Sequence, residues 1–552
     1  RKGIKTYFII MDVNKNLFKN ASTCEEKIGK LTGSALPAWI RGNVLYNGPC
    51  GVYDYDNMTV NHWFDGLSVM SLFKIKNDGN EISFTKKLLE SDAYADNIEH
   101  GRSVRAEFGT PGLSDGTKQP HNTRKGSIKP PSSTFLLHRS PSTDNFTPKD
   151  ATDNCACNFY QYGNLTMAST ETAFDRIIDP DTLETGDLVD MSNLVNIKTG
   201  RPLRDHNGDL YNVAASFVAG LKYHFIKFPK PEEGTMYARD YFPSDVKFVA
   251  TLPTRFPHHL SYVHTFGLTD NYLIFCEQPW ASNMSKLMTC RSQGRSFKEC
   301  LEWMPSENNR FYIIDKSSGR NMEIKYMTDE PFYFLNFINC YECGNHVVVD
   351  IIAYDDPEIL DDMYIEKLRN SDTFTGVGHK STIKRFVLPL DYQEDSIDLN
   401  GGKWKEATAI RSHNTITLHG SVLCDHKGME HPKVNPNFLF RKYNFSYVVG
   451  WMHSLDGDCH FANAVTKIDV ETGMTLSWRT DDEYCHPSEV VFVPNPAGTS
   501  EDDGVLISCV SNAQDENEGY IVFISARNMK EIARASFDEA IPYGSHTFYI
   551  QK

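Results

Sequence analysis

The sequence lacks any apolar run long enough for a transmembrane helix, which needs roughly 18 or more residues, although 40% of its 552 residues are hydrophobic. Basic residues are also in deficit. The 56 Lys and Arg face 72 Asp and Glu, which gives a net charge of −16 and a pI near 5.6. This balance argues against binding to nucleic acid and to anionic membrane surfaces. The length is ample for a large folded core.

The spacing expected for a zinc site is also absent. The 13 cysteines include two close pairs, Cys155/Cys157 and Cys340/Cys343, but the first has a single intervening residue and no matching histidine pair. The sequence allows disulfides such as Cys290–Cys300, but which cysteines pair cannot be derived from their spacing alone. The alternative is a set of reduced thiols in a cytosolic protein.

Short apolar segments that run into Asp-containing turns and out again are abundant. Examples are residues 176–182, 311–319 and 466–473. Each predicts a strand, a tight turn and a returning strand. Such hairpins along the whole chain favour one all-β domain over residues 1–552, built from propeller blades that are too irregularly spaced to be counted.

Four motifs occur in order along the chain: LPAWIRGNVLYNGP at residues 36–49, HWFDG at 62–66, YVHTFGLT at 262–269 and EDDGV at 501–505. Together they resemble the carotenoid cleavage oxygenases, most closely the animal branch with its carotene oxygenases, insect isomerooxygenases and retinoid isomerase. The resemblance implies a seven-bladed β-propeller with loops and short helices capping one face.

The resemblance also implies a ferrous iron held by four histidines, of which two are present here. His264 lies in the YVHTFG segment, and His546 ends the segment IPYGSH. Arg201 stands at the first ligand position, before a turn of the family type, and Asn336 stands at the third. A guanidinium has no lone pair to offer a metal at neutral pH, so the family's iron site is degenerate in this chain.

The three glutamates that orient histidines in the family all have counterparts, at Glu171, Glu430 and Glu489. By analogy Glu171 would orient His264 and Glu489 would orient His546, whereas Glu430 would face Asn336. We expect Arg201 to form an ion pair with Glu430, since a buried carboxylate requires compensation.

These substitutions predict a site without iron. The alternative is Fe²⁺ in a rebuilt site, with His206 replacing the missing ligand if its loop shifted in register. A lone histidine in an apolar strand, such as the one expected around His264, is by itself more often a core residue than a ligand. The argument therefore depends on all five residues, two histidines and three glutamates, following the family order.

Six Asn-x-Ser/Thr sequons are present, at Asn20, Asn57, Asn145, Asn164, Asn283 and Asn444. They are N-glycosylation acceptors only in a secreted protein. Asn145 is the weakest of them, because Pro148 directly follows its Thr147. Together with the cysteines they favour an extracellular glycoprotein over a cytoplasmic protein.

Residues 111–150, which follow the segment Glu107-Phe108-Gly109-Thr110, are rich in Pro, Ser, Lys, Asp and Gly. In the membrane-binding relatives this segment carries an apolar patch that enters the lipid. The composition here predicts a mobile polar insertion in the cap, and therefore no stable membrane insertion.

Three functions follow as hypotheses. The first is a secreted, non-catalytic protein that carries a carotenoid, an apocarotenoid or another long apolar ligand as cargo or pigment. The second is a divergent oxygenase or isomerase with a rebuilt metal site. The third is a ligand-free storage or structural glycoprotein, with self-association open in each case. The first is favoured, because the degenerate iron site, the sequons and the polar insertion agree with it.

Overall fold

The computed structural model describes residues 13–76, 79–112, 151–217, 220–232, 246–370, 379–392, 398–455 and 461–552. The expected insertion therefore lies, from residue 113 on, outside the described residues, and so does the sequon at Asn145.

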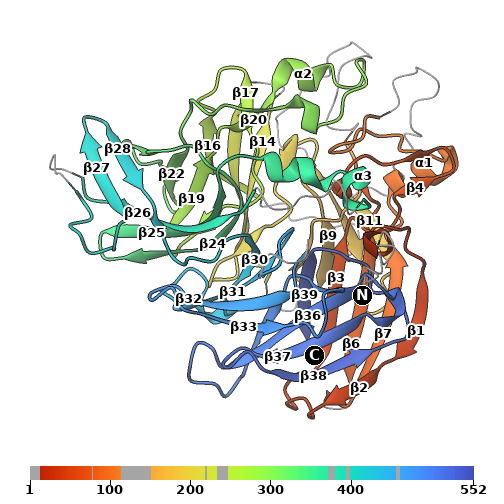
Figure 1. The fold of residues 1–552 in the computed structure, drawn as a ribbon. Coiled ribbons are helices and arrows are strands. Elements are labelled where there is room, and N and C mark those ends of the chain that lie inside the picture. The colour runs from red at the N-terminus through yellow and green to blue at the C-terminus, as the bar shows by residue number, and fades with distance from the viewer. Residues whose placement is uncertain are drawn as a thin grey trace, which may run out of the picture.

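Seven antiparallel or mixed sheets of four to six strands form the body of the protein (Figure 1). The first contains β1 (Cys24–Ile28), β7 (Glu81–Leu88), β6 (Val69–Lys76), β3 (Gly42–Gly48) and β39 (His546–Gln551). The second contains β11 (Thr185–Asp190), β10 (Phe174–Ile178), β9 (Leu165–Ser169) and β8 (Asn158–Tyr162). The third contains β12 (Ile197–Lys198), β14 (Leu210–Ser216), β15 (Lys222–Phe228) and β16 (Lys247–Pro253), with β13 (Leu203–Arg204) beside β14.

Four further sheets complete the body of the protein. The fourth contains β18 (Gly267–Leu268), β19 (Tyr272–Glu277), β22 (Arg310–Asp315), β23 (Lys325–Thr328), β28 (Thr415–His419) and β27 (Thr408–Ser412). The fifth contains β24 (Tyr333–Cys343), β25 (His346–Tyr354), β26 (Thr382–Pro389) and β29 (Ser421–Val422). The sixth contains β30 (Met429–Lys433), β31 (Phe445–Gly450), β32 (Ala464–Asp469) and β33 (Thr475–Arg479). The seventh contains β2 (Lys30–Gly33), β38 (Glu531–Ser536), β37 (Tyr520–Ser525), β36 (Gly504–Asn512) and β34 (Cys485–Pro487), with β35 (Val491–Pro494) beside β36.

Smaller elements lie between these sheets. A three-stranded sheet is formed by β17 (His259–Ser261), β20 (Trp280–Asn283) and β21 (Leu301–Trp303), and a short pair by β4 (Asp54–Tyr55) and β5 (Met58–Thr59). The helices are α1 (Asp92–His100), α2 (Met284–Met288) and α3 (Ile365–Leu368), with 3₁₀ turns η1 (Val13–Asn16), η2 (Trp63–Asp65), η5 (Lys298–Cys300), η6 (Glu358–Met363), η7 (Pro436–Phe438) and η8 (Glu516–Glu518). No described helix is long and apolar enough to cross a bilayer.

The central strands are apolar on both faces because each sheet is covered by its neighbours. β25 has the sequence HVVVDIIAY, with eight of its nine residues buried. Between the first and seventh sheets, Phe73, Phe84, Ile507 and Phe523 share one core. Each such side chain stabilises the fold by about 1.5–3 kcal/mol through its removal from water.

The predicted hairpins are present and share one turn chemistry. The carboxylates of Asp179, Asp315 and Asp469 each accept backbone N–H groups two and three residues further along the chain. Gly319 and Gly473 then take positive φ angles of 70° and 78°, which glycine adopts without steric cost. An Asp at the end of an apolar segment therefore indicates a tight turn, because its carboxylate binds the backbone of the next few residues.

The two ends of the chain close the ring of sheets. β39 pairs with β3 in antiparallel register, from Gly42 opposite Gln551 to Asn47 opposite His546. β2 likewise pairs with β38, and Figure 1 shows the red N-terminal and blue C-terminal strands side by side. The all-β, seven-bladed propeller expected from the sequence is confirmed.

Candidate functional site

Each of the seven sheets contributes to one group of buried or half-buried polar side chains, here named the axial cluster. Its members lie at strand ends or in the loops next to them. They are Glu171, Arg201, His264, Asn336, Glu430, His431, Glu489 and His546. The structure therefore brings together all seven site residues that the sequence indicated, and adds His431.

His264 is oriented by Glu171. Its Nδ1 lies 2.5 Å from Glu171 Oε1, and the Tyr262 hydroxyl donates to Oε2 of the same carboxylate at 2.7 Å. A proton held on Nδ1 by this contact leaves the Nε2 lone pair of the imidazole available. This is the pairing expected from the sequence, while the role of His264 as a metal ligand stays a prediction.

Glu430 is satisfied by neutral donors. Asn336 lies where β24 loses register with β25, and its Nδ2 donates to Glu430 Oε2 at 2.7 Å. The Tyr354 hydroxyl donates to Oε1 at 3.0 Å. Burial raises the pKa of Glu430 to about 7, so this carboxyl needs no cation. The expected ion pair between Arg201 and Glu430 is wrong for this reason.

Arg201 pairs instead with Glu489. Its Nη2 lies 3.2 Å from Glu489 Oε1, and Nη1 donates to Asn336 Oδ1 at 3.3 Å. Lys433 Nζ lies 3.2 Å from the same glutamate oxygen. Burial opposes the ionisation of Glu489, but the charges of Lys433 and Arg201 outweigh it and hold the pKa of this carboxyl well below its usual range.

His546 is the first residue of β39. Its Nδ1 lies 3.7 Å from Glu489 Oε2, and the backbone N–H of Thr547 donates to that oxygen at 3.0 Å. Arg201 Nη2 also contacts the imidazole. Burial and the guanidinium charge lower the pKa of His546 well below its usual value, so the imidazole is neutral.

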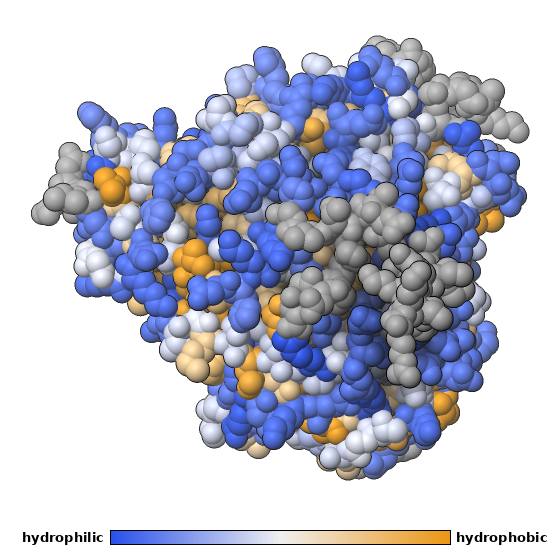
Figure 2. Space-filling view, in the orientation of Figure 1, coloured by the Kyte–Doolittle hydropathy of each residue, from blue (hydrophilic) through white to orange (hydrophobic). Residues whose placement is uncertain are grey.

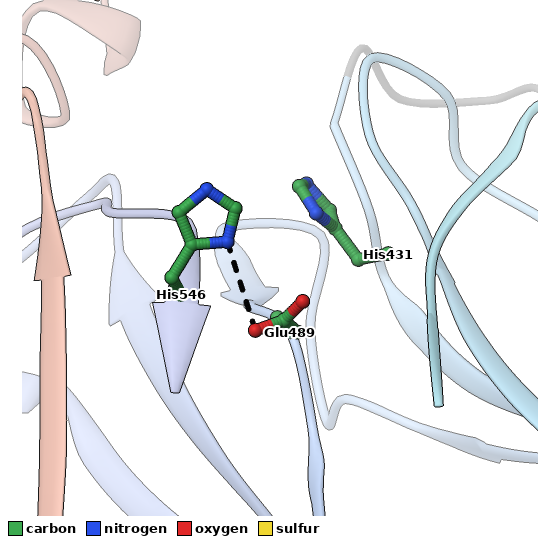
Figure 3. A group of neighbouring side chains, drawn as sticks. All are labelled: His431, Glu489 and His546. Atoms are coloured by element: carbon green, nitrogen blue, oxygen red, sulfur yellow. Dashed lines mark ion pairs between the residues drawn. The ribbon is translucent and has the colours of Figure 1, made fainter. Parts of the chain in front are cut away.

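His431 is the functional candidate that sequence reasoning missed. It follows Glu430 at an interruption in the register of β30 and β31, with a positive φ of 51°. Its ring lies 5.7 Å from that of His546, and burial lowers its pKa to about 3. Figure 3 shows the two imidazoles on either side of the Glu489 carboxylate. The only sequence signal was a histidine beside an expected glutamate.

His206 does not replace the missing ligand. Its side chain is exposed, and its ring contacts Phe440 with 5.9 Å between centroids. Asp205 holds the turn in place by accepting the N–H groups of Asn207 and Asp209, which prevents the shift in register.

An iron bound by four histidines does not fit these residues. At two of the four positions the side chains are a guanidinium and an amide, and the amide is committed to Glu430. The Arg201 charge also lies against His546 and Glu489, where a cation of that site would stand. The four-histidine chemistry of the family is therefore not available to this chain in that form.

A cavity of about 250 Å³ opens beside the axial cluster. Its walls are mainly apolar, with Phe64, Phe108, Val263, Leu335 and Trp451 among the lining residues. His264, His431 and His546 line the same cavity. An apolar cavity of this kind suits a hydrocarbon ligand, which would lie next to imidazoles and carboxyl groups.

The expected glycosylation and disulfide residues are distributed away from this cluster. Asn20, Asn57, Asn164 and Asn444 are exposed, whereas Asn283 is half-buried and caps α2. The twelve cysteines in the described ranges are thiols and form no disulfide with one another. Cys290 and Cys300 are close enough to hydrogen bond, and this bond and burial raise the pKa of Cys300.

Solved structures of similar fold are carotenoid-processing proteins. A variant of the apocarotenoid oxygenase of Synechocystis superposes with a TM-score of 0.72, and 98% of each chain is covered at 18% sequence identity. The cobalt-substituted form of that enzyme gives the same values. This similarity establishes the fold.

Proteins that are similar to this chain in sequence carry the names of enzymes. The β,β-carotene 15,15'-dioxygenase of Gallus gallus is 32% identical over 542 residues, covering 96% of this chain and 97% of its own. The Homo sapiens protein of the same name is 32% identical over 94% of this chain and 91% of its own. These relatives, which are named as dioxygenases, contradict the expected secreted, non-catalytic carrier.

The sequence profile of a family described as Retinal pigment epithelial membrane protein matches residues 17–551. The match spans every sheet of the propeller and every residue of the axial cluster. The chain therefore belongs to this family, the carotenoid cleavage oxygenases of animals.

Proposed function

We propose that this protein is a divergent carotenoid oxygenase, which cleaves an alkene bond of a carotenoid or apocarotenoid with dioxygen. In this reaction the C=C bond and the O–O bond break, and two C=O bonds form, so no further oxidant or reductant is required. The observation that carries the proposal is the apolar cavity bordered by His264, His431 and His546, in a chain whose relatives are dioxygenases.

The residues of the cavity have separable roles in this proposal. The apolar wall binds the polyene and excludes water, which favours a long hydrocarbon over a polar ligand. Glu171 and Tyr262 fix His264, and Glu430 is held by Asn336 and Tyr354. These hydrogen bonds keep the polar groups in place next to the polyene without a cost of reorganisation.

The test is incubation of the purified protein with β-carotene and with a long apocarotenal, in detergent under air and under nitrogen. We expect two carbonyl fragments under air, with one oxygen atom in each, and unchanged substrate under nitrogen. Liquid chromatography with mass spectrometry measures both. Unchanged substrate under air, or only a geometric isomer of it, would contradict the proposal.

A matched pair of variants shows where the reaction takes place. Leu335→Trp places a larger side chain in the cavity wall and is expected to abolish cleavage. Leu476→Trp adds the same side chain at a position that is 48% exposed on β33, and is expected to leave cleavage unchanged. Equal activity of the two variants would show that the cavity is not the substrate site.

A further inference from the structure

We propose that His431, Glu489 and His546 form a metal site of two imidazoles and one carboxylate, which takes a divalent first-row transition metal. One ligand atom from each residue lies within 4.8 Å of the others, and Figure 3 shows the three groups converging on one space. This metal site rests on the proposed function in one respect, namely that the cavity beside it is the substrate pocket.

The donor set is chemically suited to such an ion. Two imidazoles and one carboxylate, with further positions open, hold non-haem iron in many oxygenases and also bind zinc or cobalt. The side chains are buried, with 6% of His431, 0% of Glu489 and 7% of His546 exposed. A metal here would be shielded from solvent on the protein side and would face the cavity that both histidines line.

Two independent features of His431 indicate that it has a ligand to bind. Its Nδ1 is buried and has no hydrogen-bond partner among the described residues, which is costly for an imidazole nitrogen unless something else satisfies it. Its backbone has a φ of 51°, which is unusual for a residue other than glycine and is found preferentially at functional sites.

Arg201 is the group that competes with the metal. Its guanidinium contacts His546 and pairs with Glu489, so in the metal-free protein it neutralises the carboxylate that a cation would otherwise meet. Its Nε is buried and lacks a partner within the part of the chain that the structure describes. This nitrogen loses no hydrogen bond when the side chain moves away from an incoming ion, and the ion takes over the charge contact with Glu489 that the guanidinium leaves. Lys433 remains paired with Oε1 of Glu489, the oxygen that Arg201 also contacts.

The site is therefore a replacement for the four-histidine centre, shifted toward the sixth and seventh sheets. Glu489 would become a direct ligand rather than a residue that only orients His546. His264 keeps its own partner, Glu171, and is not required for this ligand set.

The experiment titrates the metal-free, full-length protein with Co²⁺ and records the visible absorption of the bound ion and the stoichiometry. We expect one Co²⁺ per chain. His431→Gln should weaken binding by at least ~10-fold, and His206→Gln, an exposed histidine off the site, should not change it. Arg201→Met should strengthen binding by ~10-fold, because a positive charge is removed from beside the ion.

A second measurement does not depend on how the variants fold. Anomalous scattering from a crystal of the wild-type protein soaked in Co²⁺ should place the ion between His431, Glu489 and His546. An ion bound by His264 and His546 without His431 would overturn the proposal, and so would binding that His431→Gln leaves intact or the absence of binding in both the wild type and Arg201→Met.

The outcome is distinguishable from that of the oxygenase test. No metal at these residues together with intact cleavage of the polyene would remove the metal site and leave the proposed function. Metal at these residues without cleavage would confirm the site and contradict the oxygenase.

Discussion

At the scale of single residues, the axial cluster shows which side chains a linear motif can identify. The motifs identified His264, His546, Glu171, Glu430 and Glu489 as residues of one site, and the structure brings them together. Their roles around a metal stay predictions. His431 and the partners of Arg201 escaped the motifs for a physical reason. Both depend on backbone register: a positive φ directs the His431 imidazole, and the choice of Asn336 rather than Arg201 for Glu430 depends on sheets far apart in sequence.

The first prediction concerns the two substituted ligand positions. Replacing Arg201→His and Asn336→His together should create a four-histidine site that binds about one Fe²⁺ per chain, because Glu430 already accepts a hydrogen bond from position 336 and Arg201 no longer supplies a competing charge. Elemental analysis of the purified variant measures the iron. Arg201→His alone is the control and should bind less. A folded double variant without iron would show that the backbone of the site has shifted.

At the scale of elements, short turns and long-range pairings differ in how far sequence reveals them. The Asp-containing hairpins were predicted because each turn uses donors and acceptors only a few residues apart. Sequence could not predict the parallel pairing of β23 with β28 or the pairing of β2 with β38. Strands that are far apart in the chain leave no local pattern that indicates their pairing. The His62 motif at η2 lies between these cases: its imidazole caps the turn locally and also meets the Leu360 carbonyl, far away in sequence.

The second prediction is that His62 makes the fold sensitive to acid. Burial lowers the pKa of His62 to about 3. Between about pH 6.5 and pH 3, the His62 imidazole is therefore protonated in the unfolded chain and neutral in the folded chain. Stability should therefore fall as the pH drops from about 6.5 toward 3, by at most ~1.4 kcal/mol per pH unit from this residue. His62→Gln should reduce that slope relative to the wild type. Urea unfolding at a series of pH values measures it, and parallel curves for the two proteins would refute the assignment.

The third prediction concerns β3 and the segment before β39. A Cβ atom at Gly48 would lie 2.5 Å from the Cα of Gly544, so Gly48→Val must push the end of β3 away from the segment that leads into His546. We expect destabilisation of about 1–3 kcal/mol and weaker binding of any ligand of the axial cluster. Gly344→Asn is the control, since Gly344 has a φ of 57° with open space around it and asparagine tolerates that conformation. Chemical denaturation compares the two, and equal stability would contradict the close contact.

At the scale of the whole molecule, the exterior is polar and the sheets carry their apolar side chains inward. Figure 2 shows hydrophilic residues over most of one face, with hydrophobic residues in small separate groups. Sequence composition anticipated this, as it anticipated a single repetitive β architecture. It could not determine the compartment, because sequons and thiols are compatible with more than one.

The fourth prediction follows from the exposure of the sequons. If the chain is expressed through the secretory pathway of animal cells, we expect glycans at Asn57 and Asn164, which lie in exposed turns, and none at Asn283. The half-buried Asn283 donates from its amide to Glu302 and caps α2 with its carbonyl, so a glycan on this nitrogen would disturb both contacts when the chain folds. Peptide mass spectrometry after enzymatic deglycosylation checks each position. A glycan at Asn283, or none at Asn57 and Asn164, would refute it.

The closing strand β39 has a consequence for how the cell makes this protein. His546 and the partner strand of β3 both belong to β39, which is synthesised long after β3, so neither the ring nor the axial cluster can be complete before β39 has been made. A premature stop codon upstream of His546 would remove a cluster histidine and expose the edge of β3 in the same event. A truncated product should thus be unstable and cleared by proteases, rather than persist as an inert competitor for the substrate.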